Sequence, residues 1–252
     1  MFTSYLALGA IGGAVSFSAT ALGSVLAMGS WRAHPFTKLR FSVDFALGVM
    51  LSVVAFSLVG PATLNSISQP HLLTYNVLGF AVGGILITGL KVFIEKVQTR
   101  IPHESNASLS SQYLLVAALM IHNFPEGLAS GASVIGLGPA AATSILGPIA
   151  LQNIPEGVLM VVCLRALGWS RAAALIGGLV SGLVEFVGGL AAGLALGLTE
   201  AILPVILMLA GGAMLVSVVL EMAEKGSVIK QALKPEFAAG LLLIPFLNVI
   251  VG

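Results

Sequence analysis

The chain has 252 residues, of which 58% are hydrophobic and only 8% are charged, and its mean hydropathy is +1.06. These values lie far outside the range of soluble domains and indicate an integral membrane protein. The net charge of +1 argues against a nucleic-acid partner, and the single cysteine, Cys163, excludes a disulfide framework or a thiolate metal cluster.

Apolar runs separated by mostly short connectors divide the chain into eight predicted membrane helices. A hydrocarbon core about 30 Å thick needs roughly 20 apolar residues per helix. The predicted helices lie at residues 3–30, 42–64, 72–97, 111–137, 140–165, 170–197, 201–223 and 236–251. The first lacks a preceding basic region and is long enough to span, so we expect a retained helix rather than a signal peptide. The chain is expected to form one all-α transmembrane domain, residues 1–252, without an appended soluble domain.

The distribution of basic residues predicts the orientation of these helices. All eleven lysines and arginines lie in or beside the connectors that follow the first, third, fifth and seventh helices. Alternate connectors, such as NSISQPH and GLGPA, contain none. Lysine and arginine are enriched on the cytoplasmic side of membrane proteins. We therefore expect a protein of the cytoplasmic (plasma or inner) membrane whose two termini lie on the side away from the cytoplasm.

Two similar hexapeptides lie 30 residues apart, in the fourth and fifth predicted helices: HNFPEG and QNIPEG. In the first, a spacing of four residues places His122 and Glu126 on one helix face, with Asn123 rotated about 100° to the side. The second copy repeats this arrangement with Gln152, Asn153 and Glu156. Because the two helices run antiparallel, their central polar turns are expected to face each other.

Each hexapeptide contains a proline that is predicted to kink its helix. Pro125 and Pro155 lack an N–H, and their rings clash with the carbonyls of Ile121 and Leu151 four residues earlier. Freed backbone groups are tolerated in lipid only where other groups satisfy them or where they line a polar site.

The two glutamates of the hexapeptides need a counter-charge. An ionised carboxylate at the bilayer centre costs at least about 2.5 kcal/mol, and two facing each other also repel. No lysine or arginine is available at that depth. A divalent cation would neutralise both, and imidazole with carboxylates suits Zn²⁺, while further oxygen donors broaden the site toward Fe²⁺, Mn²⁺ and Cd²⁺. A hydrogen-bonded histidine with a protonated acid could explain one hexapeptide, but two in register favour a metal site.

Five further residues are candidates for the same function. Glu185, in the middle of the sixth helix, is either another metal ligand or a neutral, hydrogen-bonded acid. Met50 in the second helix is either a thioether ligand or a packing residue. Asp44, Glu221 and Glu224, near the cytoplasmic ends of their helices, form either an acidic exit pathway or ordinary solvated caps.

The two hexapeptides and the eight-helix layout resemble the ZIP family (Zrt- and Irt-like proteins) of divalent metal transporters, in its prokaryotic GufA-like branch. The resemblance covers essentially the whole chain and implies a binuclear metal centre between the fourth and fifth helices. One implied site consists of Met50, His122, Glu126, Gln152 and Glu156. The second consists of Asn123, Asn153 and Glu185, with Glu126 and Glu156 bridging the two metals.

The resemblance also implies two four-helix groups, helices 1, 4, 5 and 6 against 2, 3, 7 and 8, that slide past each other in an elevator-like cycle. This sequence departs from the family at three positions. Asn153 stands where related members often have aspartate, so the second site lacks a charge. Gln152 replaces the histidine of many eukaryotic members, a change expected to relax the preference for zinc. Leu220 stands where relatives can have a histidine before Glu221.

We therefore expect a transporter that moves Zn²⁺, and also Cd²⁺, Fe²⁺ or Mn²⁺, into the cytoplasm, with the metals and the lipid bilayer as partners and a homodimer as a further expectation. One alternative is a carrier of another solute in which the buried glutamates move protons. Another is an intramembrane metal hydrolase, against which stands the absence of a His-Glu-x-x-His pattern. A purely structural membrane protein would leave the buried carboxylates unexplained.

Overall fold

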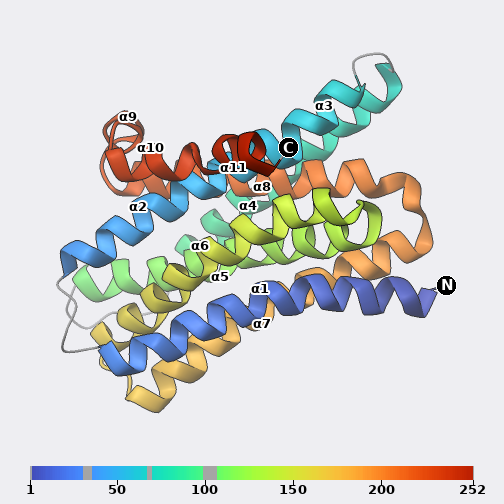
Figure 1. The fold of residues 1–252 in the computed structure, drawn as a ribbon. Helices are drawn as coiled ribbons and strands as arrows, with labels where there is room; N and C mark the ends of the chain where they lie inside the picture. The colour runs from blue at the N-terminus through green and yellow to red at the C-terminus, as the bar shows by residue number, and fades with distance from the viewer. Residues whose placement is uncertain (1, 31–35, 67–69, 99–106, 252) are drawn as a thin grey trace.

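The computed structural model describes residues 2–30, 36–66, 70–98 and 107–251, and the regular elements of this part of the chain are all helices (Figure 1). They are α1 (Phe2–Ser30), α2 (Phe36–Ser52), the π-helix η1 (Val53–Val59), α3 (Gly60–Ser66), α4 (Pro70–Gln98), α5 (Ala107–Gly136), α6 (Pro139–Ala166), α7 (Arg171–Leu198), the 3-10 turn η2 (Glu200–Ile202), α8 (Leu203–Glu224), α9 (Val228–Ala232), α10 (Pro235–Leu241) and α11 (Leu243–Val251). An all-α membrane protein is therefore supported.

Six stretches within the described residues are long and apolar enough to cross a membrane. They are Thr3–Gly29, Val43–Leu64, His71–Lys96, Pro139–Ala166, Arg171–Leu198 and Glu200–Glu224. The fourth predicted helix corresponds to α5, whose hydropathy is lowered by its polar hexapeptide. The eighth is interrupted at Leu242 and forms α10 and α11, each too short to cross alone. The count of eight crossings stays a prediction.

Several helix ends that carry basic residues lie at one end of the molecule, on the left in Figure 1. This end is formed by the last turns of α4, α6 and α8 and the first turn of α7, and we call it the basic end. It carries Lys91, Arg165, Arg171, Lys225 and Lys234. Arg32 and Arg100 lie outside the described residues. The clustering agrees with the charge pattern of the sequence, and the membrane orientation of the termini stays a prediction.

Contacts between helices divide the molecule into two groups (Figure 1). In the first group, α1, α5, α6 and α7 pack on one another; in the second, α2 packs on α10 and α4 packs on α8. The groups meet mainly where α5 contacts α8 and where α6 contacts α2 and η1. This division agrees with the arrangement that the ZIP resemblance implies.

Glycines allow α1 and α7 to pack with their backbones almost in contact. A Cβ atom at Gly9 would lie 2.4 Å from the carbonyl oxygen of Gly189, and a Cβ at Gly189 would lie 2.4 Å from that of Gly9. Such contacts are too short for any side chain. Small residues at helix interfaces are typical of membrane proteins, where close packing drives association in place of the hydrophobic effect.

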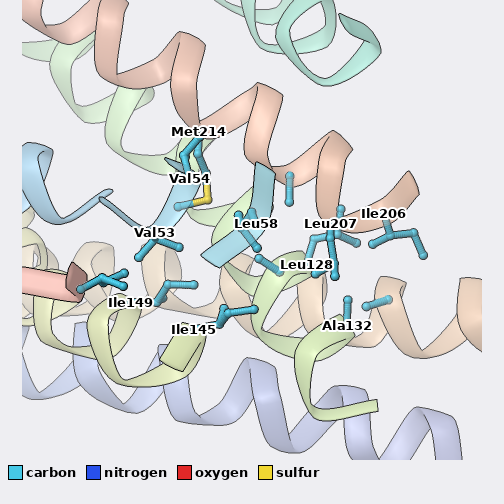
Figure 2. Packing of buried hydrophobic residues seen from close by; sticks show 14 of the residues in the cluster. Val53, Val54, Leu58, Leu128, Ala132, Ile145, Ile149, Ile206, Leu207 and Met214 are labelled. Atoms are coloured by element: carbon cyan, nitrogen blue, oxygen red, sulfur yellow. The ribbon is translucent and has the colours of Figure 1, made fainter. Parts of the chain in front are cut away.

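An apolar cluster fills the seam between the two groups, as Figure 2 shows. The first group contributes residues from α5 and α6, such as Leu128 and Ile149, and the second contributes residues from η1 and α8, such as Leu58 and Met214. In α5 the cluster begins after the hexapeptide and continues away from the basic end. The seam is therefore apolar on that side of the hexapeptides.

Ser52 satisfies the backbone at the break between α10 and α11. Pro245 has no N–H to donate, which leaves the carbonyl of Leu241 without its helical partner. The Ser52 hydroxyl donates to that oxygen at 2.7 Å and accepts from the Ile244 N–H at 3.4 Å. The break is thus held by α2, directly before the π-helix η1.

Candidate metal centre

The two hexapeptides lie at the middle of α5 and α6, where their polar side chains are buried. Pro125 and Pro155 both lie inside continuous helices, so neither proline ends its helix. The side chains concerned are His122, Asn123, Glu126, Gln152, Asn153 and Glu156, and each is less than one-tenth exposed. The structure therefore brings together the polar groups that the repeat predicted to face each other.

The glycine that ends each hexapeptide brings a third helix close to the centre. A Cβ atom at Gly127 would lie 1.9 Å from the carbonyl oxygen of Glu185 in α7. A Cβ at Gly157 would lie 2.1 Å from the carbonyl oxygen of Thr20 in α1. Helices α7 and α1 can therefore direct their own polar side chains into the centre.

Two contacts between α5 and α6 join the hexapeptides directly. Nε2 of His122 lies 2.8 Å from Oε1 of Glu156. The Gln152 amide donates from Nε2 to Oε1 of Glu126 at 2.6 Å. Each residue is thus paired with one from the other helix, and both glutamates are buried.

Glu185 of α7 is the centre of a second set of contacts. Asn153 donates to its Oε2 at 2.7 Å, Asn123 donates to its Oε1 at 3.2 Å, and the Thr20 hydroxyl also donates to Oε1. Asn123 donates further to the carbonyl and hydroxyl oxygens of Ser181, both at 3.0 Å. The three residues that the resemblance assigns to the second metal site are therefore in direct contact.

Within the described residues, four buried oxygen atoms of the two hexapeptides have neither a hydrogen-bond donor nor an ion-pair partner. They are Oδ1 of Asn123, Oε2 of Glu126, Oε1 of Gln152 and Oδ1 of Asn153. A buried polar atom without a partner costs about 1–3 kcal/mol, and such atoms are rare in native proteins. Oxygens of this kind are the donors that divalent cations take from amides and carboxylates. Their number in one place fits a site for a cation.

The centre differs from a zinc site built only from histidine, cysteine and acidic residues. Within the described residues, no three or more of these side chains are grouped closely enough to hold a metal. The amide oxygens would therefore have to serve as ligands. Met50 is a further donor within reach, because its buried side chain lines a cavity together with His122 and Glu156.

Two small cavities lie between the two helix groups, on the basic side of the centre. The first is bounded by α2, α5, α6 and α8 and includes Met50, His122, Glu156 and Glu221. The second is bounded by α4, α5 and α8 and includes Lys91 and Glu224 as well as His122 and Glu221. Because both cavities touch His122 and Glu221, they lead from the centre toward the basic end.

The three acids of the predicted exit pathway lie at the basic end, and each contacts a lysine. Glu224 lies 2.5 Å from Lys91, and Glu221 lies 3.0 Å from Lys225. Asp44 contacts two lysines, at 2.6 Å and 3.6 Å. Asp44 and Glu221 are buried and paired, whereas Glu224 is paired but about two-fifths exposed, and the exit pathway stays a prediction.

Comparison with known proteins gives the family of the chain. The family model described as ZIP Zinc transporter matches residues 95–241, which include both hexapeptides and Glu185. The chain belongs to the ZIP family.

Curated ZIP relatives match over much of the chain. It is similar to Zinc transporter GufA of Myxococcus xanthus, with 40% identity over 170 residues, covering 64% of this chain and 66% of the relative. It is also similar to Zinc transporter ZIPB of Bordetella bronchiseptica, with 31% identity over 211 residues, covering 81% and 68%. Zinc transporter ZIP11 of Xenopus tropicalis is 39% identical over 118 residues, covering 44% and 35%. The chain thus spans about two thirds of the length of the first two relatives.

Sequence reasoning missed three contributors to this ZIP centre. Thr20 and Ser181 contact Glu185 or its partner Asn123, and Ser217 lines the second cavity. Hydroxyl residues are common in membrane helices, so their presence carried no signal. The spacing of Ser16, Thr20 and Ser24 by four residues could have indicated one polar face on α1.

Proposed function

We propose that this ZIP protein transports divalent metal cations, Zn²⁺ among them, through the centre between α5 and α6. The observation that carries the proposal is the group of four buried oxygens without donors, beside the paired His122 and Glu156. The relatives are named zinc transporters, which favours a transporter over an enzyme and argues against the hydrolase alternative.

We propose two adjacent metal positions within this centre. The first would use Met50, His122, Glu126, Gln152 and Glu156. The second would use Asn123, Asn153 and Glu185, with the two hexapeptide glutamates between the metals. Imidazole, thioether and carboxylate donors suit Zn²⁺ and Cd²⁺ at the first position, whereas the second offers only oxygens and suits harder ions such as Mn²⁺. Glu185 is the carboxylate that would belong to the second position alone.

Transport would proceed by movement of the first helix group against the second. The cavities on the basic side of the centre and the apolar seam on the other side support a conformation that is open toward the basic end. With the basic end cytoplasmic, as the charge pattern predicts, this state would release metal inward. A shift of the first group along the seam would expose the centre on the opposite side.

The decisive experiment is ⁶⁵Zn²⁺ uptake by proteoliposomes that contain the purified protein. We expect saturable uptake that Glu126→Gln and Glu156→Gln each reduce at least tenfold, because each variant removes one charge from ligands shared by both positions. Glu95→Gln is the matched control, since Glu95 is an exposed glutamate of α4 and its loss should leave uptake unchanged. Competition by Cd²⁺, Mn²⁺ and Fe²⁺ would rank the metals.

Folded protein that neither binds nor moves any of these metals would refute the proposal. Proton movement that depends on the same glutamates would then favour a proton-coupled carrier of another solute.

A further inference from the structure

A cluster of charged groups adjoins both cavities at Glu221. Lys225, the first residue after α8, lies 3.0 Å from Oε1 of Glu221 and 3.6 Å from Oδ1 of Asp44. Lys234 lies 2.6 Å from the other oxygen of Asp44. The cluster therefore joins α2, the end of α8 and the segment before α10 through two acids and two lysines.

The ammonium of Lys225 contacts two buried carboxylates, whereas that of Lys91 contacts Glu224 and Glu95, which are both more than one-third exposed. The backbone N–H of Lys225 bonds to the Glu221 carbonyl at 3.2 Å, which places the side chain over the last turn of α8. Gly226, with φ of +107°, then turns the chain away. The ammonium is thus held beside Glu221, which lines both cavities, by the end of the helix itself.

Glu221 connects this cluster to the metal centre. Its side chain is 8% exposed and lines both cavities together with His122, which contacts Glu156. A cation that leaves the centre through either cavity therefore meets Glu221 next. Asp44, 5% exposed, lies on the far side of the same ammonium.

Without Lys225, this arrangement of acids would attract a cation. One oxygen of each carboxylate lies within 3.6 Å of a single point, the ammonium nitrogen. A metal ion at that point would be within reach of both carboxylates. Lys234, which contacts Asp44, would neutralise only one of their two negative charges. A cation held there would leave slowly, which would limit transport.

We infer that Lys225 is a built-in competitor of the transported cation, whose ammonium occupies the place between Glu221 and Asp44 and so prevents these acids from retaining the ion. The inference rests on the proposed function and adds a residue that governs metal release. During release, the ammonium would move aside as the cation reaches Glu221 and then return. A purely structural tie between α8 and α2 is the alternative.

Equilibrium binding and release of ⁶⁵Zn²⁺ by the full-length purified protein distinguish these possibilities. We expect Lys225→Met and Lys225→Gln to bind one more Zn²⁺ per chain than the unmodified protein. Both variants should also release bound Zn²⁺ about tenfold more slowly, because a tenfold change corresponds to the loss of a modest competing interaction. Lys225→Arg keeps the charge and should behave as the unmodified protein. Lys230→Met is the matched control, because Lys230 is an exposed lysine of α9 outside the cluster.

A double variant identifies the acids responsible. Adding Glu221→Gln to Lys225→Met should return the count of bound Zn²⁺ to that of the unmodified protein. If both single variants are folded and bind and release Zn²⁺ as the unmodified protein does, Lys225 is only a structural tie and the inference is wrong. If the unmodified protein itself neither binds nor transports metal, the proposed function fails and the inference fails with it.

Discussion

Hydroxyl groups along one face of α1 link this helix to each of its three neighbours in the first group. Ser16 hydrogen-bonds to Ser130 of α5 at 2.7 Å, and Thr20 donates to Glu185 of α7. Ser24 donates to the Gly157 carbonyl of α6 at 3.4 Å. Helix α1 contributes none of the proposed ligands, yet it holds the helices that do.

We expect Thr20→Val to weaken metal binding by about 10-fold, because residues that orient a ligand typically contribute this much to metal affinity. The valine has nearly the same shape and removes only the hydrogen bond to Glu185. The measurement is the affinity of the purified protein for Zn²⁺ and for Mn²⁺. The ion that prefers the second position should lose more affinity.

Two further variants control for effects on folding. Thr20→Ser should restore affinity, because it restores the hydroxyl. Ser18→Ala removes an exposed hydroxyl of α1 that bonds only within its own helix, to Ala14, and should have no effect. Equal affinity in Thr20→Val and the unmodified protein would show that Glu185 needs no support from α1.

At the scale of elements, the glycines of α6 have two different roles. Gly157 faces the carbonyl oxygen of Thr20, and a Cβ there would approach it to 2.1 Å. Gly147, almost three turns earlier in the same helix, has no atom of another described element within 4 Å of its would-be Cβ. Only the first is required by the packing of α1 on α6.

We expect Gly157→Ala to destabilise the protein by about 1–3 kcal/mol, because the methyl group forces α1 away from α6. Gly147→Ala, the matched control, should be neutral or slightly stabilising, since alanine favours helix more than glycine does. Thermal unfolding in detergent gives the comparison. Equal unfolding temperatures for the two variants would mean that α1 can move without cost.

The second predicted helix and the last one are less regular than their sequences indicate. Both are predominantly apolar, so the hydrophobic pattern carries no sign of the π-helix η1 or of the contact between Ser52 and the break at Leu242. Pro245 was a visible signal for the break. The sequence could not show how the freed carbonyl of Leu241 is satisfied, because its hydrogen-bond donor, Ser52, lies in another helix.

At the scale of the whole molecule, the seam between the two groups decides whether the first can slide. The Ser57 hydroxyl of η1 donates to the Ser144 carbonyl of α6 at 3.3 Å, across the seam. The contact between Ser16 and Ser130 lies entirely within the first group. These two contacts offer a matched pair of positions for cross-linking.

We expect a disulfide between Ser57→Cys and Ser144→Cys to reduce ⁶⁵Zn²⁺ uptake at least tenfold, because it would tie the moving group to the other. A disulfide between Ser16→Cys and Ser130→Cys should leave uptake largely intact. Both cysteine pairs should be introduced into a Cys163→Ala variant. A reductant should restore uptake by the protein that carries the first pair. Full uptake with the first pair cross-linked would contradict a sliding mechanism.

Several features of this protein could be obtained from its sequence because they depend on local spacing or on composition. Extreme hydropathy indicated a membrane protein, and the repeated hexapeptide identified the residues that α5 and α6 bring together. Similarly, the carboxylates without nearby basic residues indicated where a cation would be needed. Each conclusion required only helix periodicity and the cost of charge in lipid.

Only the tertiary structure decided which groups from other helices complete the centre. Thr20, Ser181 and the lysine between Asp44 and Glu221 reach their partners because glycine contacts and the end of α8 bring separate helices together. The sequence separation is 165 residues for Thr20 and Glu185 and 58 residues for Asn123 and Ser181. No local pattern encodes such a contact, because it depends on how whole helices pack rather than on the conformation of any one of them.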